Sequence, residues 1–165
     1  MYINREMDKI PVKTAYEVHH STQTKDYNQM NENEQQRVNE TFAHGTENFT
    51  PDDLKKVIDD GETAVTKSGK LGKQFENFKL LWGLLKDYYN KKYPNAPWKL
   101  IAAIGFAVAY LISPLDVIPD FLPIVGFVDD ASVFALVVAG FSSDIEDYKK
   151  WLASQKPKNP PQIKA

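Results

Sequence analysis

Apolar side chains gather in one stretch of the chain. In residues 98–141, 31 of the 44 side chains are apolar, with a single cation and four aspartates. Two runs in this stretch, 100–112 and 131–141, hold no charged side chain and predict two helices. The segment between them, 113–130, contains three prolines and one glycine, which favour a turn. The pattern predicts an apolar helical hairpin with a Pro/Asp-rich connector, over residues 97–154.

The second helix of this hairpin is expected to extend beyond its apolar run. Ile145, Tyr148 and Trp151 follow at helical spacing, which predicts an amphipathic continuation of the same helix. After it, residues 155–165 are rich in proline and lysine. Because proline lacks the backbone donor and disfavours helical geometry in the residue before it, this end is expected to be an extended tail.

Two amphipathic helices are predicted before the hairpin, in residues 50–96. Thr50 and Pro51 favour a helix start, because the hydroxyl can cap free amides and proline suits the first helical position. The first helix is expected over 51–67 and the second over 70–92. The second carries an apolar stripe with alternating spacings of four and three: Leu71, Phe75, Phe78, Trp82, Leu85 and Tyr89. We expect this stripe to face a core or a partner.

Residues 1–49 are expected to form a disordered polar arm. About 15 of the first 50 residues are apolar, and they follow neither a helical nor a strand period. The fold class predicted from the whole pattern is all-α: a small helical domain built around the apolar hairpin and preceded by the disordered arm.

Composition narrows the possible functions. The formal net charge is -2, so no global positive field would attract nucleic acid, and no nucleic-acid partner is expected. The chain has no cysteine, which excludes disulfides and thiolate metal sites. Its first residues lack the apolar region of a secretory signal, and no common catalytic or nucleotide-binding motif occurs. We therefore expect a non-enzymatic protein in the cytoplasm or on its membrane face.

Two environments fit the hairpin. The upstream helices can cover it in a small soluble bundle. Alternatively, it can enter a bilayer, although a helix of about 15 residues spans only about 22 Å of a hydrocarbon core of about 30 Å. Lysines flank the hairpin on both sides and are absent from the connector, the pattern of a membrane hairpin with both termini cytoplasmic. The flanking lysines are Lys86, Lys91, Lys92, Lys99, Lys149, Lys150, Lys156, Lys158 and Lys164.

The connector and its flanks also resemble a known family. Tyr110-Leu-Ile-Ser-Pro-Leu-Asp-Val-Ile-Pro-Asp-Phe-Leu-Pro-Ile-Val-Gly-Phe-Val-Asp-Asp130 is similar to the signature of the YkvA-like family, a conserved bacterial domain of unknown function. The resemblance covers residues 97–141. It implies a link to membranes, since many members are described as membrane proteins, and it implies no activity, cofactor or catalytic residue. The motif positions are Ser113, Pro114, Asp116, Pro119, Asp120, Pro123, Gly126, Asp129 and Asp130.

Four aspartates of this motif are candidate metal ligands. Asp116, Asp120, Asp129 and Asp130 lie within 15 residues of otherwise apolar sequence. A structural interpretation is available, because such carboxylates favour turns and the first turns of helices. If the hairpin brings them together instead, a cation, protons or a basic partner must compensate their mutual repulsion, and among cations oxygen ligands suit Mg²⁺, Mn²⁺ or Ca²⁺. A proton-sensing or ion-pathway role is a third alternative.

Two main functions of different class follow from these patterns, and a metal-dependent enzyme that uses the aspartate cluster is a third alternative. The first is a non-catalytic, membrane-associated helical protein that acts as a scaffold or partner-binding module. The second is a soluble helical domain that binds a divalent cation or a protein partner through the Asp-rich connector. Membrane lipid, a protein partner and a second copy of the chain are the expected partners, because an exposed apolar stripe requires cover.

Overall fold

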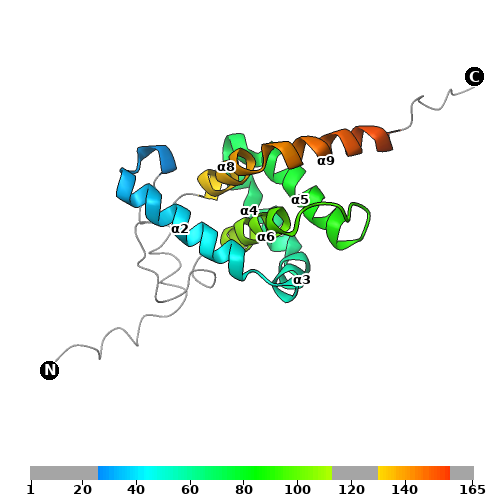
Figure 1. Ribbon diagram of the computed structural model, residues 1–165, viewed down its shortest axis with the longest axis horizontal. Helices are drawn as coiled ribbons and strands as arrows, with labels where there is room; N and C mark the ends of the chain where they lie inside the picture. Colours follow the sequence, from blue (N-terminus) through cyan, green and yellow to red (C-terminus); the bar gives the residue numbers. More distant parts are fainter. Residues whose placement is uncertain (1–25, 113–129, 157–165) are drawn as a thin grey trace, which may run out of the picture.

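Helices account for all regular secondary structure in the part of the chain that the structure, a computed structural model, describes: residues 26–112 and 130–156. The all-α prediction is confirmed (Figure 1). In chain order the elements are η2 (Tyr27–Gln29), α2 (Glu32–Asn48), α3 (Pro51–Asp59), α4 (Gly61–Ser68), η3 (Gly69–Gln74), α5 (Phe75–Tyr89), α6 (Trp98–Ile112), α8 (Asp130–Gly140) and α9 (Ser142–Gln155).

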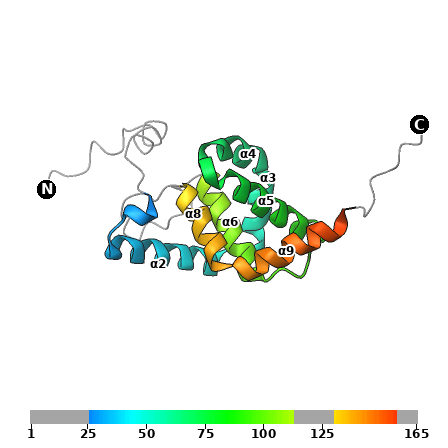
Figure 2. The ribbon, with the colours of Figure 1, turned by 90° about the horizontal axis from the view of Figure 1, so that it is seen from above.

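Helix α6, the first helix of the apolar hairpin, lies at the centre of the fold (Figures 1 and 2). It packs against α2, α3, α4, α5 and α8, and every residue from 100 to 108 is buried. Burying one large aliphatic or aromatic side chain contributes about 1.5–3 kcal/mol. The apolar run thus forms the core of a helical bundle.

A helix that could span a bilayer is not found within 26–112 or 130–156. Helix α6 has 15 residues and α8 has 11. The expectation of a transmembrane helix finds no support in these two ranges.

The second hairpin helix is divided, which differs from the prediction of one continuous helix. Helix α8 ends at Gly140, and Phe141 has non-helical backbone angles (φ −130°, ψ 31°) before α9 begins. Glycine has a low helix propensity, which favours a break at this place. The change of direction allows Ile145 and Tyr148 of α9 to be buried against the rest of the bundle.

The expected disordered arm is corrected over its second half, because α2 is folded. A reciprocal capping box starts this helix: the Asn31 side chain accepts from the Glu34 amide at 2.9 Å, and Glu34 accepts from the Asn31 amide at 3.0 Å. Phe42 packs edge-on against Phe106 of α6, with ring centroids 5.5 Å apart. Few residues of α2 are apolar, but the helix folds because these residues pack against the apolar surface of α6. Residues 1–25 lie outside the described part.

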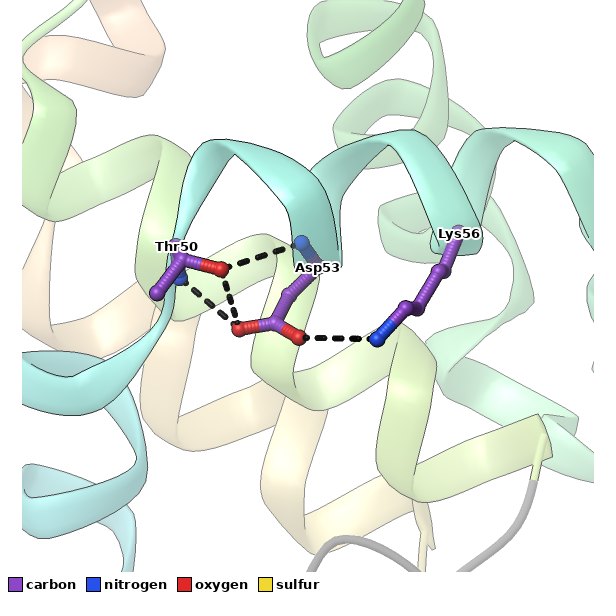
Figure 3. A network of polar contacts seen from close by, with 3 residues as sticks. All are labelled: Thr50, Asp53 and Lys56. Atoms are coloured by element: carbon purple, nitrogen blue, oxygen red, sulfur yellow. Dashed lines mark hydrogen bonds and ion pairs between the residues drawn. The ribbon is translucent and has the colours of Figure 1, made fainter.

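The predicted helix start at Thr50 is confirmed (Figure 3). Thr50 Oγ1 accepts a 3.2 Å hydrogen bond from the Asp53 amide, and Asp53 Oδ2 accepts one of 2.9 Å from the Thr50 amide. The helix predicted over 51–67 is split into α3 and α4. At the split, a Cβ on Gly61 would lie 2.7 Å from a ring carbon of Trp82, so close approach to α5 requires glycine there.

The apolar stripe of the next helix is buried only in part. Leu71, Phe78, Trp82 and Leu85 are buried, together with Leu81 and Leu84, which the stripe did not include. Phe75 and Tyr89 lie at the two ends of α5 and are 37% and 38% exposed. The helix is also shorter than the predicted 70–92, since Gly72 has a positive φ of 53° in the preceding η3. The stripe therefore faces the core at Leu71, Phe78, Trp82 and Leu85, and it is partly exposed at Phe75 and Tyr89.

Candidate functional site

The family motif joins the ends of α6 and α8 that lie farthest from Trp98. Helix α6 stops at Ile112 and α8 begins at Asp130. Nearly all the motif positions predicted from the sequence, and the Asp130 side chain, lie outside the described residues. The positions concerned are Ser113, Pro114, Asp116, Pro119, Asp120, Pro123, Gly126 and Asp129.

Both ends of the connector are held by residues from outside the hairpin. Lys67, on α4, donates a hydrogen bond through Nζ to the backbone carbonyl of Ile112. A cation at this position satisfies a free carbonyl and complements the negative end of the α6 dipole. At the other end, the amide of Tyr27 donates a 3.0 Å hydrogen bond to Oγ of Ser132, in the first turn of α8. Elements α4 and η2 therefore fix the two points between which the family motif runs.

The proposed divalent-metal site stays a prediction. In ranges 26–112 and 130–156, no three histidine, aspartate or glutamate residues are grouped so that they could hold a metal ion. The four aspartates of the hypothesis belong to the connector or its boundary, so the described residues neither assemble nor separate them.

The opposite end of the hairpin carries an exposed aromatic side chain. Trp98, the first residue of α6, is 37% exposed. Its ring lies 6.3 Å from that of Phe49, after α2, and 6.4 Å from that of Tyr88, at the end of α5. Three segments therefore meet around one partly exposed indole.

A second group of aromatic rings joins the loop after α5 to α9. Tyr93 packs against Tyr148 and Trp151, with centroid distances of 5.2 and 5.0 Å, and the Tyr148 and Trp151 rings stack at 5.7 Å. The buried Tyr148 hydroxyl donates a 2.6 Å hydrogen bond to Oδ2 of Asp87 on α5. Burial, and then this hydrogen bond to Asp87, raise the pKa of Tyr148 well above its ordinary value.

Exposed lysines occur on the elements that carry these two aromatic groups or next to them in the chain. We call the combined set the aromatic–lysine surface; it consists of Tyr88, Tyr89, Tyr93, Trp98, Trp151, Lys86, Lys91, Lys92, Lys99, Lys149 and Lys150. Lys149 and Lys150 each meet a carboxylate on α9, at 2.8 Å (Glu146) and 3.7 Å (Asp147). The surface therefore combines amphipathic rings with cations at the end of the hairpin that is opposite to the connector.

Comparison with known proteins identifies the family. A family model described as "Protein of unknown function (DUF1232)" matches residues 100–136, which comprise most of α6, the connector and the start of α8. The chain is 31% identical over 91 residues to "Uncharacterized membrane protein YkvA" of Bacillus subtilis (strain 168), an alignment that covers 55% of this chain and 86% of that protein. The chain belongs to this YkvA-like family of unknown function. No solved structure matches it.

Membership of the YkvA-like family confirms the prediction made from the connector motif. The family model matches the part of the hairpin from α6 to the first half of α8, whereas α2 and α9 lie outside the match. Sequence reasoning missed the supports of the hairpin, above all Lys67 and the Tyr148–Asp87 bond. Tyr148 had one signal, its helical spacing from Ile145 and Trp151, while nothing in the sequence pairs it with Asp87.

Proposed function

We propose that the chain is a non-catalytic, membrane-associated helical module. It attaches to the cytoplasmic face of a membrane through the aromatic–lysine surface and presents the connector of the family hairpin to a protein partner. The partly exposed indole of Trp98, at the lysine-flanked end of α6, is the observation that carries this proposal. The description of the Bacillus relative as a membrane protein supports it.

The chemistry of the surface favours a lipid interface. Tryptophan and tyrosine are enriched where a membrane meets water, because one part of the ring is apolar and the other is polar. Lysine stems can lie along apolar material while their charged ends reach anionic headgroups. Tyr89 and Trp98 are exposed by more than a third, and Lys91, Lys92 and Lys99 are exposed residues close to them in the sequence.

The covering of α6 supports attachment through a surface over insertion of the hairpin. Five helices pack against α6 and its residues 100–108 are buried. Moving this helix into lipid requires those contacts to be broken, whereas the aromatic–lysine surface can reach headgroups without rearrangement. In this arrangement the connector follows the far end of α6, so a protein partner can bind it while the aromatic–lysine surface contacts the membrane.

Sedimentation with lipid vesicles tests the proposal. The full chain should bind phosphatidylglycerol-containing vesicles, and more weakly phosphatidylcholine vesicles, in a salt-dependent manner. The double variant Lys91→Gln/Lys92→Gln should weaken binding by about 30-fold, since each lysine near an anionic surface contributes about 1 kcal/mol. Its matched control is Lys70→Gln/Lys73→Gln, which removes two exposed lysines from η3 and should leave binding less affected.

A second pair of variants tests the aromatic part of the surface. Tyr89→Ser removes a ring at the end of α5 that belongs to the surface, and Phe75→Ser removes an equally exposed ring at the start of the same helix. We expect Tyr89→Ser to weaken vesicle binding more than Phe75→Ser. Absence of vesicle binding, or equal losses within both pairs of variants, would contradict the proposal.

A further inference from the structure

A pocket of about 550 Å³ lies beside the aromatic–lysine surface. It is formed by α2, the start of α6 and the end of α8, and its walls are mainly carbon, from Phe42, Trp98, Leu136 and Phe141. Its volume falls in the range of about 300–1,000 Å³ that is typical of sites for small molecules. Trp98 belongs both to this pocket and to the aromatic–lysine surface, so the two are continuous.

The lining of the pocket includes one cation and one anion. Lys99 of α6 and Glu47 of α2 both line it, and both are exposed. Among the described residues, neither takes part in an ion pair. A ligand that carries an anionic and a cationic group close together would complement this pair of charges.

A buried hydroxyl provides a second indication of a ligand. Thr46 lines the same pocket, is only 6% exposed, and its Oγ1 has no hydrogen-bond partner within ranges 26–112 and 130–156. Buried polar atoms in native proteins are nearly always paired, with protein, water or a bound molecule. Rotation about the Thr46 Cα–Cβ bond moves the hydroxyl between staggered positions, which gives it more than one direction in which to meet a polar group of a ligand.

The break between α8 and α9 contributes to the pocket wall. Gly140 and Phe141, at the break, both line the pocket. A Cβ built on Gly140 meets no atom within 4 Å. A side chain introduced at this pocket-lining position therefore should not disturb the bundle.

We propose that this pocket binds one acyl chain of a phospholipid with an ethanolamine-type headgroup. The chain packs against Phe42, Leu136 and Phe141, the phosphate meets Lys99, and the ammonium meets Glu47. The proposal rests on the proposed function, since continuity through Trp98 allows a lipid to pass from the membrane into the pocket. The aromatic–lysine surface alone requires only that the lipid headgroups be anionic. The pocket adds a preference for one class of lipid.

A single-chain probe tests the pocket directly. Lysophosphatidylethanolamine, kept below its critical micelle concentration, should raise the melting temperature of the full chain in a saturable manner. Gly140→Phe should weaken this binding by at least about tenfold, because the ring fills the acyl site. Gly69→Phe is the matched control, since a Cβ on Gly69, in η3, likewise meets no atom within 4 Å. This variant should bind the probe as tightly as the unaltered chain does.

Two further arms test the headgroup. Lys99→Gln and Glu47→Gln should each weaken binding of the probe, and an alkyl maltoside with the same chain length should bind less tightly than the probe. Glycerophosphoethanolamine, which has the headgroup without the chain, should give no shift. A probe that never saturates, or that binds Gly140→Phe and Gly69→Phe equally, overturns the proposal, and so does a maltoside that binds as tightly as the probe.

The outcome is separable from that of the proposed function. Vesicle binding without saturable binding of the probe would overturn the pocket and leave the aromatic–lysine surface intact. If the chain binds the probe saturably but does not bind vesicles, the result would support the pocket and contradict membrane attachment. Gly140→Phe alters neither Tyr89 nor the lysines, so it should retain vesicle binding.

Discussion

Tyr148 and Asp87, 61 residues apart in the chain, are joined by a 2.6 Å hydrogen bond from the phenolic hydroxyl to Oδ2 of the carboxylate. The bond fixes α9 against the end of α5. A Cβ on Gly83, one turn before Asp87, would lie 3.3 Å from the same hydroxyl oxygen, so the tyrosine lies close to the α5 backbone. This contact holds the second aromatic group of the aromatic–lysine surface in place.

Stability should therefore fall at alkaline pH. Burial and the bond to Asp87 raise the pKa of Tyr148 above its ordinary value of 10.0 in the folded chain. Above about pH 10 the unfolded chain loses the phenolic proton while the folded chain keeps it, so unfolding becomes more favourable as the pH rises. Urea unfolding at pH 8, 10 and 11 should show this decline, and it should be shallower for Tyr148→Phe. An equal decline in both proteins would exclude Tyr148 as its source.

At neutral pH, Tyr148→Phe should also lower the free energy of unfolding. The substitution keeps the ring and leaves the Asp87 carboxylate without its donor, and hydrogen bonds to charged groups contribute about 1.5–3 kcal/mol. Because Asp87 is only partly buried, we expect the lower part of this range. Denaturant unfolding measures the loss. A change below about 0.5 kcal/mol would show that water replaces the hydroxyl.

Packing of α2 on α6 should be sensitive to one glycine. A Cβ on Gly45 would lie 2.1 Å from a ring carbon of Phe106, a distance that forces the ring or the helix to move. Gly45→Ala should therefore destabilise the fold by about 1–3 kcal/mol, although alanine favours a helix. Gly69→Ala, where an added Cβ meets nothing within 4 Å, is the control and should be neutral or slightly stabilising. A neutral Gly45→Ala would mean that α2 is not docked on α6 in solution.

The start of α3 depends on one hydroxyl. Thr50→Ala removes the oxygen that accepts from the Asp53 amide and should cost about 0.5–2 kcal/mol of stability. Thr50→Ser retains an acceptor at the same place and should lose much less. Thermal unfolding of the three proteins compares them, and equal melting temperatures for the alanine and serine variants would exclude the cap as the cause.

The sequence predicts most of the helices from local signals. The apolar run of α6 and the cap at Thr50 are local features, and both are observed. The folding of α2 depends on an apolar surface that α6 provides, and so it was not visible in the polar composition of residues 26–49. The break at Phe141 follows Gly140, a local signal, and it is accompanied by the packing of Tyr148 against α5. Tertiary contacts therefore add to local signals in both of these elements.

The candidate site is less predictable than the fold. The family was recognisable, because the connector motif is itself a sequence pattern. The pocket beside Trp98 was not predicted, since its walls come from α2, α6 and α8, which are distant in the chain. Its charged residues, Glu47 and Lys99, resemble ordinary surface charges until the fold places them in the lining of one pocket.

The metal hypothesis for the connector makes a separate prediction. If Asp116 and Asp120 bind a divalent cation, Mg²⁺, Mn²⁺ or Ca²⁺ should raise the melting temperature of the full chain, since binding stabilises the folded state. The shift should disappear in Asp116→Asn/Asp120→Asn. Thermal unfolding with and without each cation measures it. A shift that the double variant retains in full would remove both residues from the site.

The most direct measurement is fractionation of cells that produce the full chain. Membranes are pelleted and washed successively with high salt, alkaline carbonate and detergent. We expect the chain to pellet with the membranes and to be released before the detergent step, because the aromatic–lysine surface attaches it while α6 stays covered by its five neighbouring helices. Retention until detergent would show that the hairpin is inserted, and a chain found wholly outside the membrane pellet would contradict membrane association itself.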